Sequence, residues 1–459
     1  MPDSFEVVVI GAGTGGYSAA LRAAVLGKSV ALVERDDRLG GTCLLRGCIP
    51  TKALLQSAAI MDQVNRSAEW GIEASGQPDW PKVQEFQRKV VDKLVSGLTS
   101  LVKARKIEVV QGTAKLTGPT RVQLGDRTLE AGDVVVATGS RPKLLPGMEV
   151  GQRVITSDQA LGLDRIPSSA VIIGAGAVGL EFASLYRSLG ADVTVIEALP
   201  NLAPLEDEDI SKEVARAFRK RQIASHAGAS VKEVKEEGGA VTVAFEDAKG
   251  KSQSVEADIS LVAVGRGPIT EDLGLEDLGV ETDRGYVKVN GQMQTSVEHV
   301  WAIGDVSSSP FQLAHVSMAE GVAVAERIAG QDVAELDYAG VPRVTFSSPE
   351  VASVGLTEAQ ARERGHEVEI EKLNMQGLGK ANMLGEGGMC KVVAEKDGPV
   401  LGIHMVGPHV TDLVAEGMLI TNWEAMPAEV AALIHPHPTL SEAIGEAHLA
   451  LAGKPLHTM

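Results

Sequence analysis

The pattern of apolar and polar positions repeats in the first half of the chain. The stretches that begin at Val8 and Val171 each read as an apolar strand, a glycine turn, a helix of small and apolar residues, and a second strand that ends in an acid. Aligned without a gap, Glu34 falls on Glu197. The paired glycines are Gly11 with Gly174, Gly13 with Gly176, and Gly16 with Gly179. We therefore predict two β-α-β units.

Each unit has the pattern of a dinucleotide-binding turn. The glycines permit a sharp turn and let the backbone approach a pyrophosphate, while the following helix offers free N–H groups and the positive end of its dipole. The acid would accept a hydrogen bond from a ribose hydroxyl. One glycine turn often serves packing alone, but two copies in register indicate two dinucleotides with hydride or electron transfer between them. No Lys or Arg occurs in residues 198–209, which favours NAD over NADP.

Other parts of the chain show both helical and strand-like periodicity. Residues 53–66 and 82–105 have apolar positions at helical spacing, and residues 121–140 alternate and turn like strands. A third pattern begins at about Val341. Its strand-like segments are 390–395 and 400–407, and a helix is expected around 412–421. The fold class is therefore predicted to be α/β in several domains.

Composition narrows the class of protein. The 459 residues carry a formal net charge of −18 and only 3 % aromatic residues, which argues against nucleic-acid binding. The N-terminus lacks the features of a secretory signal, and no uncharged apolar run is long enough to span a bilayer. Three cysteines indicate a reducing compartment. We expect a cytoplasmic protein or a mature organellar form, without a membrane partner.

Two of the three cysteines lie just after the first glycine turn. Cys43 and Cys48 stand at the entry of an apparent helix, with Lys52 close by. They could be two buried thiols. A helix N-terminus and a lysine lower the pKa of a thiol, however, and this favours a redox pair. An ideal helix holds residues five apart too far from each other for a disulfide, so a bond requires irregular backbone. Gly40, Gly41 and Pro50 would provide it.

The segment "HPHPTLSEAIGE" near the C-terminus offers a base. Only a thiolate attacks a disulfide well, so the incoming thiol must lose its proton. Histidine is the natural acceptor, and Glu442 could orient the imidazole of His435 or His437.

Together these motifs resemble the dihydrolipoamide dehydrogenase family, within the disulfide oxidoreductases that include glutathione and mercuric reductases. The resemblance covers essentially the whole chain. It implies an α/β homodimer with two Rossmann-like dinucleotide-binding domains, a central region and a C-terminal α+β dimerisation domain. The implied boundaries are 1–148 for the FAD-binding domain, 149–267 for the NAD-binding domain, 268–338 for the central domain and 339–459 for the interface domain.

The resemblance also implies roles for single residues. Cys48 would face the flavin and Cys43 would meet the substrate, with Lys52 and Glu181 as an ion pair beside the flavin and nicotinamide rings. The family spacing from base to acid selects His437, with Glu442 as its partner, acting in the active site of the partner subunit. His435 would only pack a proline-rich turn. The implied FAD contacts are Gly11, Gly13, Gly16, Glu34, Lys52, Ala114, Thr138, Gly139, Asp305 and Ala314. The implied NAD contacts are Gly174, Gly176, Gly179, Glu181, Glu197, Val231 and Gly265.

Other polar residues have no such role. His315, His404 and His409 lack metal-ligand spacing, so no metal site is predicted, and Cys390 is expected in the core. The chain departs from the family at Leu45 and Arg46, where the family commonly has Asn-Val. We take Arg46 as a cation that lowers the pKa of a thiol.

The implied activity is the reoxidation of dihydrolipoamide, free or as the lipoyl groups of 2-oxoacid dehydrogenase complexes or the glycine cleavage system, with reduction of NAD⁺. The acyltransferase component of such a complex is then a candidate protein partner. Glutathione reductases need basic residues after the second acid, and mercuric reductases carry a C-terminal cysteine pair; neither feature is present. An NAD(P)H-dependent reductase of another small-molecule disulfide, and a scaffold subunit with a structural flavin, are the alternatives.

Overall fold

The computed structural model describes residues 3–457, and the chain divides into two compact units. Each unit is assembled from segments that are far apart in the sequence. The first contains Met1–Leu54, Pro81–Lys143 and Gly265–Tyr338, and the second contains Leu55–Trp80, Leu144–Val264 and Ala339–Met459. Helices α3 (Cys48–Arg66) and α4 (Trp80–Ala104) begin in one unit and end in the other.

A seven-stranded sheet organises the first unit, in the order β3-β2-β1-β6-β5-β4 with β19 beside β6. Strands β1, β2, β3, β6 and β19 are parallel, and β4 and β5 form an antiparallel edge. The strands are β1 (Asp3–Ile10), β2 (Val30–Glu34), β3 (Glu108–Gln111), β4 (Lys115–Gly118), β5 (Arg121–Leu124), β6 (Arg127–Val136) and β19 (Val300–Ala302).

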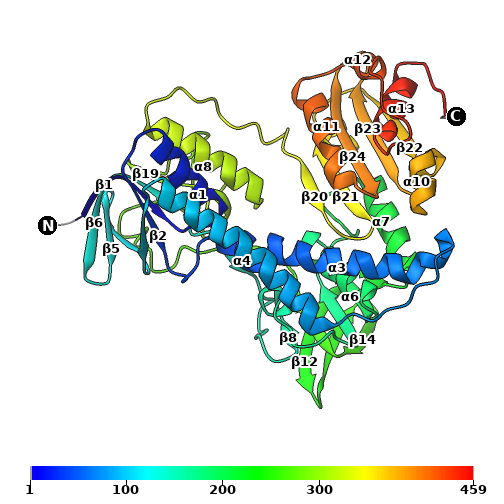
Figure 1. Cartoon of the computed structure of the whole chain (residues 1–459), viewed down its shortest axis with the longest axis horizontal. Helices are drawn as coiled ribbons and strands as arrows, with labels where there is room; N and C mark the ends of the chain where they lie inside the picture. The colour runs from blue at the N-terminus through cyan, green and yellow to red at the C-terminus, as the bar shows by residue number, and fades with distance from the viewer. Residues whose placement is uncertain (1–2, 458–459) are drawn as a thin grey trace. The chain divides into compact units, whose positions relative to one another are not determined.

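Successive side chains of β1 point to opposite faces of this sheet, and both faces are buried. Val7 and Val9 pack in one cluster with residues of α1 (Thr14–Val25) and α8 (Ala314–Ile328), and Val8 and Ile10 pack in another. Helices α1 and α8 lie side by side (Figure 1). The remaining elements of the first unit are α2 (Gly41–Arg46), the pair β7 (Ser140–Pro142) and β16 (Arg266–Pro268), the pair β17 (Thr282–Asp283) and β18 (Tyr286–Val287), and a short 3₁₀ helix (Gly304–Val306).

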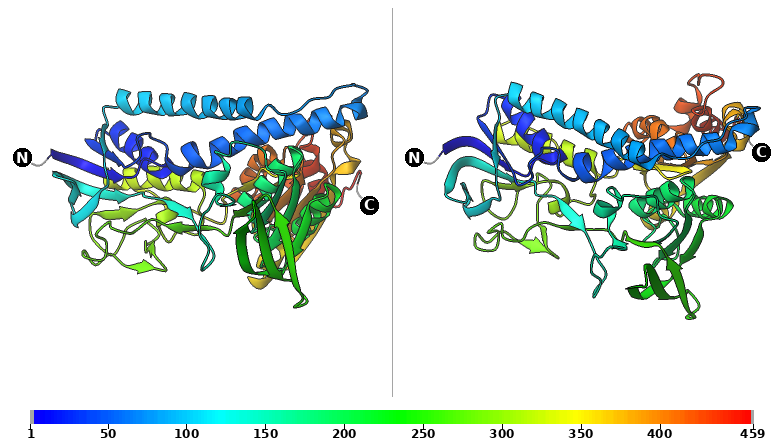
Figure 2. Two further views of the ribbon diagram at one scale, coloured as in Figure 1. Left: turned by 90° about the horizontal axis from the view of Figure 1, so that it is seen from below. Right: turned by 60° about the horizontal axis from the view of Figure 1, so that its bottom comes forward.

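The second unit contains the second predicted β-α-β unit. Its parallel sheet has the order β11-β10-β9-β15-β8, and a separate antiparallel sheet of β12, β13 and β14 forms the long green arrows of Figure 2. The strands are β8 (Val154–Ile155), β9 (Ser169–Ile173), β10 (Asp192–Glu197), β11 (Ala224–Ala227), β12 (Ser230–Glu237), β13 (Ala240–Glu246), β14 (Ser252–Ala257) and β15 (Ile259–Val262). The helices are α5 (Ser157–Ala160), α6 (Ala177–Ser188) and α7 (Glu208–Lys220).

The C-terminal part of the second unit is an antiparallel sheet in the order β20-β21-β24-β23-β22. Helices α11 and α13 pack on one of its faces (Figure 1), where they bury alternate strand residues such as Val354, Val392 and Ile403. The strands are β20 (Arg343–Thr345), β21 (Glu350–Gly355), β22 (Val368–Asn374), β23 (Met389–Glu395) and β24 (Val400–Gly407). The helices are α9 (Glu358–Glu363), α10 (Gly379–Leu384), α11 (Val410–Asn422), α12 (Pro427–Ala431) and α13 (Glu442–Leu451).

The structure confirms both predicted β-α-β units, the predicted strands of 121–140, and the late strands and helix. The helix expected over 82–105 is α4, and the one expected over 53–66 begins earlier, at Cys48. Within residues 3–457, no helix combines the length and the apolar character that a membrane span requires.

Candidate redox and dinucleotide sites

The first and third glycines of the two turns are held by close backbone contacts. Gly11 and Gly174 have φ of +103° and +104°, and a Cβ at either would lie 2.4 Å from a neighbouring carbonyl oxygen. A Cβ on Gly16 would lie 1.8 Å from the carbonyl oxygen of Gly11, and one on Gly179 would lie 1.9 Å from that of Gly174. Only glycine is compatible with these four positions, so both turns are equally sharp.

The middle glycines leave space for a ligand. Gly13 and Gly176 are the N-cap residues of α1 and α6, and no side chain caps either helix. A Cβ on Gly176 would meet nothing within 4 Å, and one on Gly13 would meet only Gly41, at 3.9 Å. Uncapped helix N–H groups beside open space suit a pyrophosphate. The residues present therefore fit one dinucleotide at each turn.

The redox segment contacts the first turn. Gly41, the first residue of α2, has φ of +57°, and a Cβ there would lie 2.5 Å from the Cα of Gly13. Among the described residues, none has an atom within 4 Å of a Cβ built on Gly176. The two turns thus differ in the surroundings of their middle glycines.

The two acids already bind their own turns. Glu34 accepts the N–H groups of Ala12 (2.7 Å) and Asp36 (2.9 Å), and Glu197 accepts those at the equivalent positions 175 and 199 (2.6 and 2.7 Å). Each acid is buried, with 7 % of its surface exposed. A carboxylate oxygen has two lone pairs, so each can accept a ribose hydroxyl as well.

Asp305 lies in a polar cluster that the sequence did not reveal. The Ser140 hydroxyl donates to its Oδ2 (2.5 Å), and Arg266 Nε lies 3.9 Å from the same atom. Arg266 also donates to the Ser140 hydroxyl (2.7 Å). Burial raises the pKa of Asp305 above its ordinary value. Ser140 and Arg266 approach Asp305 because β7 pairs with β16, a contact that sequence periodicity does not report.

The weaker candidates are spread over both units. Thr138 donates its hydroxyl to the carbonyl of Ile269 (2.6 Å), and Ala314 is the first residue of α8. Gly139 and Gly265 have positive φ, Ala114 is buried, and Val231 lies in β12. Gly265 belongs to the first unit, whereas Val231 and the second turn belong to the other. Their roles as nucleotide contacts remain predictions.

Cys43 and Cys48 lie on two different helices. Cys43 is in α2, Cys48 begins α3, and Gly47 separates them. A hydrogen bond with the Cys48 side chain and burial both raise the pKa of the Cys43 thiol, and the charge of Lys52 opposes this. The side chains of the two cysteines are therefore in direct contact, with a lysine close enough to act on them.

The irregular backbone required between the cysteines is present, but its main source differs from our prediction. Gly40 and Gly41 have positive φ, as expected at the start of α2. Pro50 instead lies in the first turn of α3, where proline is compatible with a helix. The break falls at Gly47, where a Cβ would lie 2.8 Å from the carbonyl oxygen of Thr42.

Arg46 has a carboxylate partner. Its guanidinium donates to Asp36 Oδ2, so it connects the end of α2 to the second residue after β2. The cation that lowers the pKa of Cys43 is Lys52. The structure thus gives Arg46 a role in the position of the redox segment, and its effect on the pKa of a thiol stays a prediction.

Near the C-terminus, the predicted imidazole–carboxylate pair is formed. His437 Nδ1 lies 2.8 Å from Glu442 Oε1, and the Thr439 N–H donates to the other oxygen (2.9 Å). Burial alone would raise the pKa of Glu442, but these hydrogen bonds lower it below its ordinary value. The His437 side chain is 75 % exposed and that of Glu442 is 19 % exposed. The pair therefore has a fixed acid and an accessible imidazole.

His435 forms a second such pair, which corrects our expectation that it only packs a turn. Its Nε2 lies 2.7 Å from Glu416 Oε1 on α11, and this hydrogen bond raises the pKa of His435. A Cβ on Gly445 of α13 would lie 2.5 Å from His435 Nδ1. Sequence reasoning missed Glu416 because it lies on a separate helix.

The remaining candidates divide between buried and exposed positions. Glu181 on α6 is 4 % exposed and accepts the Phe346 N–H (3.0 Å); Lys52 belongs to the other unit, so their pairing stays a prediction. Cys390 and His404 are fully buried, which confirms the core assignment of Cys390. Among residues 3–457, no three His, Cys, Asp or Glu side chains are grouped as a metal site would need.

Two family models cover most of the chain. Residues 5–321 match pyridine nucleotide-disulphide oxidoreductase, and residues 341–448 match the dimerisation domain of the same family. The chain belongs to the pyridine nucleotide-disulphide oxidoreductase family. Membership brings FAD and NAD as its two dinucleotides, in agreement with the two turns, and the dimerisation domain supports a homodimer.

Full-length relatives point to one member of this family. The chain is 43 % identical to dihydrolipoyl dehydrogenase of Bacillus subtilis and 41 % identical to that of Rhizobium etli, with 100 % of each chain covered in both comparisons. Among solved structures, LpdA of Mycobacterium tuberculosis matches with a TM-score of 0.89 at 25 % identity, covering 98 % of this chain and 99 % of the other. The HOCl-induced flavoprotein disulfide reductase RclA of Escherichia coli matches with a TM-score of 0.87 at 25 % identity, covering 96 % and 99 %.

Proposed function

We propose that this protein is an FAD-containing enzyme that oxidises dihydrolipoamide and reduces NAD⁺. The observation that carries the proposal is the contact of Cys43 with Cys48 in the segment that covers the first dinucleotide turn. Two thiols in contact can become a disulfide, and their place beside a dinucleotide gives that disulfide a route for its electrons. Relatives of the same length that are about 40 % identical carry the name dihydrolipoyl dehydrogenase.

The thiol chemistry starts from a Cys43–Cys48 disulfide. A thiolate of dihydrolipoamide attacks the Cys43 sulfur, the S–S bond breaks, and Cys48 leaves as a thiolate. The second substrate thiol then attacks the mixed disulfide, which releases lipoamide with its own S–S bond and Cys43 as a thiolate. Two electrons have moved from substrate to protein. Bound FAD would supply a two-electron acceptor for the dithiol, and bound NAD⁺ would be the final hydride acceptor.

His437 is the proposed base for the two substrate thiols in turn, and it releases the first proton to solvent before it accepts the second. The hydrogen bond from Nδ1 to Glu442 leaves Nε2 to accept a proton, and the ionised carboxylate stabilises the resulting imidazolium. The charge of Lys52 stabilises thiolates at the cysteine pair, since it acts to lower the pKa of Cys43. The proton of the substrate thiol thus passes to the imidazole of His437, which is exposed enough to contact the substrate.

An apolar surface next to His437 supports the homodimer. Side chains of α11 and the following segment expose large apolar areas that a monomer would present to water. They are Leu419 (42 % exposed), Trp423 (75 %), Met426 (36 %), Leu433 (63 %) and Ile434 (97 %). We propose that this surface lies in the dimer interface and that His437 serves the cysteine pair of the partner subunit.

The nucleotide preference follows from charge. Glu197 is buried and negative at the strand end, and residues 198–209 contain no Lys or Arg to bind a 2′-phosphate. NAD⁺ is therefore the proposed acceptor. The acyltransferase component of a 2-oxoacid dehydrogenase complex is the proposed protein partner. The small number of cysteines favours a location in the reducing cytoplasm.

The test is NADH formation from dihydrolipoamide by the FAD-loaded protein, with NAD⁺ and NADP⁺ compared. We expect fast turnover with NAD⁺ and poor turnover with NADP⁺. If NADH bleaches the flavin and dihydrolipoamide does not, dihydrolipoamide is not the substrate, and a reductase of another small-molecule disulfide is favoured. Flavin that responds to neither would favour a scaffold.

A further inference from the structure

The C-terminal sheet has one polar face buried against the nucleotide-binding part of the second unit. Strand alternation places Ser353, Lys391 and His404 opposite to the apolar face that α11 and α13 cover, and the register pairs His404 with both of the others. All three are at most 1 % exposed. A buried lysine on a sheet requires partners, because an unpaired charge there is very costly.

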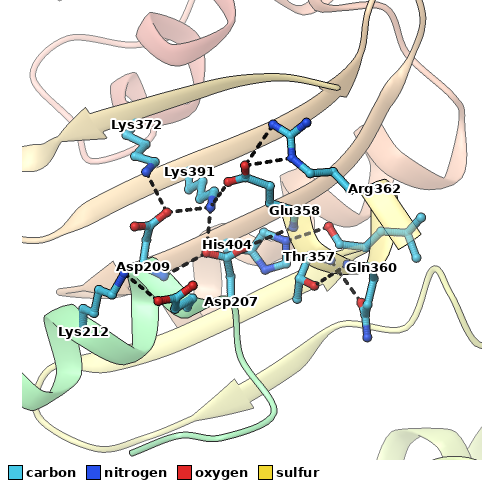
Figure 3. A network of polar contacts seen from close by, with 12 residues as sticks. Asp207, Asp209, Lys212, Thr357, Glu358, Gln360, Arg362, Lys372, Lys391 and His404 are labelled. Atoms are coloured by element: carbon cyan, nitrogen blue, oxygen red, sulfur yellow. Dashed lines mark hydrogen bonds and ion pairs between the residues drawn. The ribbon is translucent and has the colours of Figure 1, made fainter. Parts of the chain in front are cut away.

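Three carboxylates supply those partners (Figure 3). Lys391 Nζ lies 2.8 Å from Asp207, 2.6 Å from Asp209 and 2.8 Å from Glu358. Burial alone would lower the pKa of Lys391, but the three hydrogen bonds raise it above its ordinary value, so the amine is charged. Lys391 and Glu358 come from the C-terminal part, whereas Asp207 and Asp209 begin α7 of the nucleotide-binding part. The cluster therefore joins the two parts of the second unit.

Asp207 also ends the segment that follows the Glu197 acid. It is the N-cap of α7, accepts the Asp209 N–H (3.0 Å), and accepts the Glu358 N–H through its other oxygen (3.1 Å). The preceding residue, Glu206, accepts the hydroxyl of Ser353 (2.5 Å). The C-terminal sheet thus holds two successive residues at the end of the 198–207 segment.

The middle of this segment contacts the glycine turn. The Ala203 N–H donates to the carbonyl of Ala175 in the turn (3.1 Å), and Ala203 in turn accepts the Ser211 hydroxyl (3.0 Å) from α7. Glu197 accepts the N–H groups of both Ala175 and Leu199. The contacts form a continuous chain from Lys391 through Asp207 and the 198–207 segment to the turn and the acid that would hold the nucleotide.

We propose that Lys391 is a positioning residue for NAD: by anchoring Asp207 it holds the 198–207 segment in the conformation that binds the adenosine half of the dinucleotide. The proposal rests on the assignment of the second turn to NAD. The anchored segment is ordered before the ligand arrives, so binding does not have to supply the ordering entropy. Loss of the anchor then weakens the binding of NAD and leaves the thiol chemistry of the first unit unchanged.

The experiment measures the dissociation constants of NAD⁺ and of ADP-ribose for the FAD-loaded protein by calorimetry, which needs no thiol substrate. In Lys391→Met, the buried carboxylate of Asp207 loses its cation, whereas Asp209 keeps Lys372 and Glu358 keeps Arg362. Because the lost anchor is the one on Asp207, we expect both constants to rise about tenfold or more. Bleaching of the flavin by dihydrolipoamide should proceed as in the wild type. ADP-ribose lacks the nicotinamide, so an equal rise for both ligands locates the effect at the adenosine half.

Two further variants make the test decisive. Ser353→Ala removes one hydrogen bond to Glu206 without leaving an unpaired buried charge. It should weaken the binding of both ligands about threefold, and it keeps the proposal testable even if Lys391→Met does not fold. Lys212→Met is the matched control, because Lys212 pairs with Glu208 (2.7 Å) on the exposed side of the same helix. It should bind like the wild type.

The possible results separate this proposal from the proposed function. Unchanged constants in a folded Lys391→Met or Ser353→Ala would overturn the positioning role. Weaker NAD⁺ binding accompanied by an equal loss of flavin bleaching would assign Lys391 to general stability instead. Failure of the wild type to reduce NAD⁺ with dihydrolipoamide, with nucleotide binding intact, would overturn the proposed substrate and leave the role of Lys391 standing.

Discussion

His437 Nδ1 lies 2.8 Å from Glu442 Oε1, and Glu442 is the first residue of α13. The carboxylate is therefore fixed by a helix while the imidazole that it orients is largely exposed. Such a pair presents one nitrogen to a substrate and keeps the other occupied, which is the arrangement that a general base needs.

Replacement of His437 by Gln should lower the turnover of dihydrolipoamide about 10²–10⁴-fold, because no side chain then accepts the thiol proton. Steady-state NADH formation measures the effect, and nucleotide binding should not change. His409→Asn is the control: His409 is also exposed in the C-terminal part, and Asn tolerates its φ of +56°. Equal activity of His437→Gln and the wild type would refute the assignment.

The three cysteines should differ in alkylation. After reduction of the FAD-loaded protein, we expect iodoacetamide to modify Cys43, which is partly exposed and is proposed to meet the substrate. Cys390 is fully buried, so the reagent does not reach its thiol in the folded protein. Mass spectrometry of the digested protein reports the sites. Modification of Cys390 in the folded protein would contradict this expectation.

Lys52 and Arg46 should have different effects on the reactive thiol. Lys52→Met removes the positive charge that lowers the pKa of Cys43, so that pKa should rise by about one pH unit. Arg46→Leu removes a guanidinium that is already paired with Asp36, and the pKa should not change. The pH dependence of the alkylation rate gives both values. A higher pKa in Arg46→Leu would restore our original interpretation of this arginine.

The His435–Glu416 pair should contribute stability on the acidic side of neutrality. Its hydrogen bond raises the pKa of His435 above the unfolded value of about 6.5. The contribution is therefore complete below the unfolded pKa and is lost as the pH rises through the higher folded pKa. Glu416→Gln should lower the free energy of unfolding by about 1 kcal/mol at mildly acidic pH and by less at alkaline pH.

Urea denaturation at a series of pH values measures this difference. The titratable groups that face the pair are Glu442, His448 and Cys390. The pKa of His448 is lowered by burial, so its titration opposes that of His435. A difference between Glu416→Gln and the wild type that does not depend on pH would show that the pair is a neutral hydrogen bond.

The sequence predicted the parts of the molecule that short motifs encode. The first and third glycines of each turn are required by backbone geometry, and each acid binds the backbone of its own turn, all within some thirty residues. Local pattern was therefore sufficient. The cysteine pair was found for the same reason, whereas the choice of His437 over His435 as the partner of Glu442 came from the resemblance to the family. The contacts of Asp305 with Arg266, of His435 with Glu416 and of Lys391 with Asp207 were missed. They join distant segments through sheet register and helix packing, and no periodicity reports which segments will meet.

The contact between Gly41 and Gly13 has a consequence for how long each dinucleotide stays bound. A ligand on the first turn lies beneath the start of the helix that carries Cys43, so its departure requires that segment to move. In the described part of the chain, no comparable contact lies within 4 Å of a Cβ at Gly176 on the second turn. Two turns with almost the same backbone and the same acid can thus have different residence times. We expect FAD to stay bound through many catalytic cycles and NAD to exchange in each one.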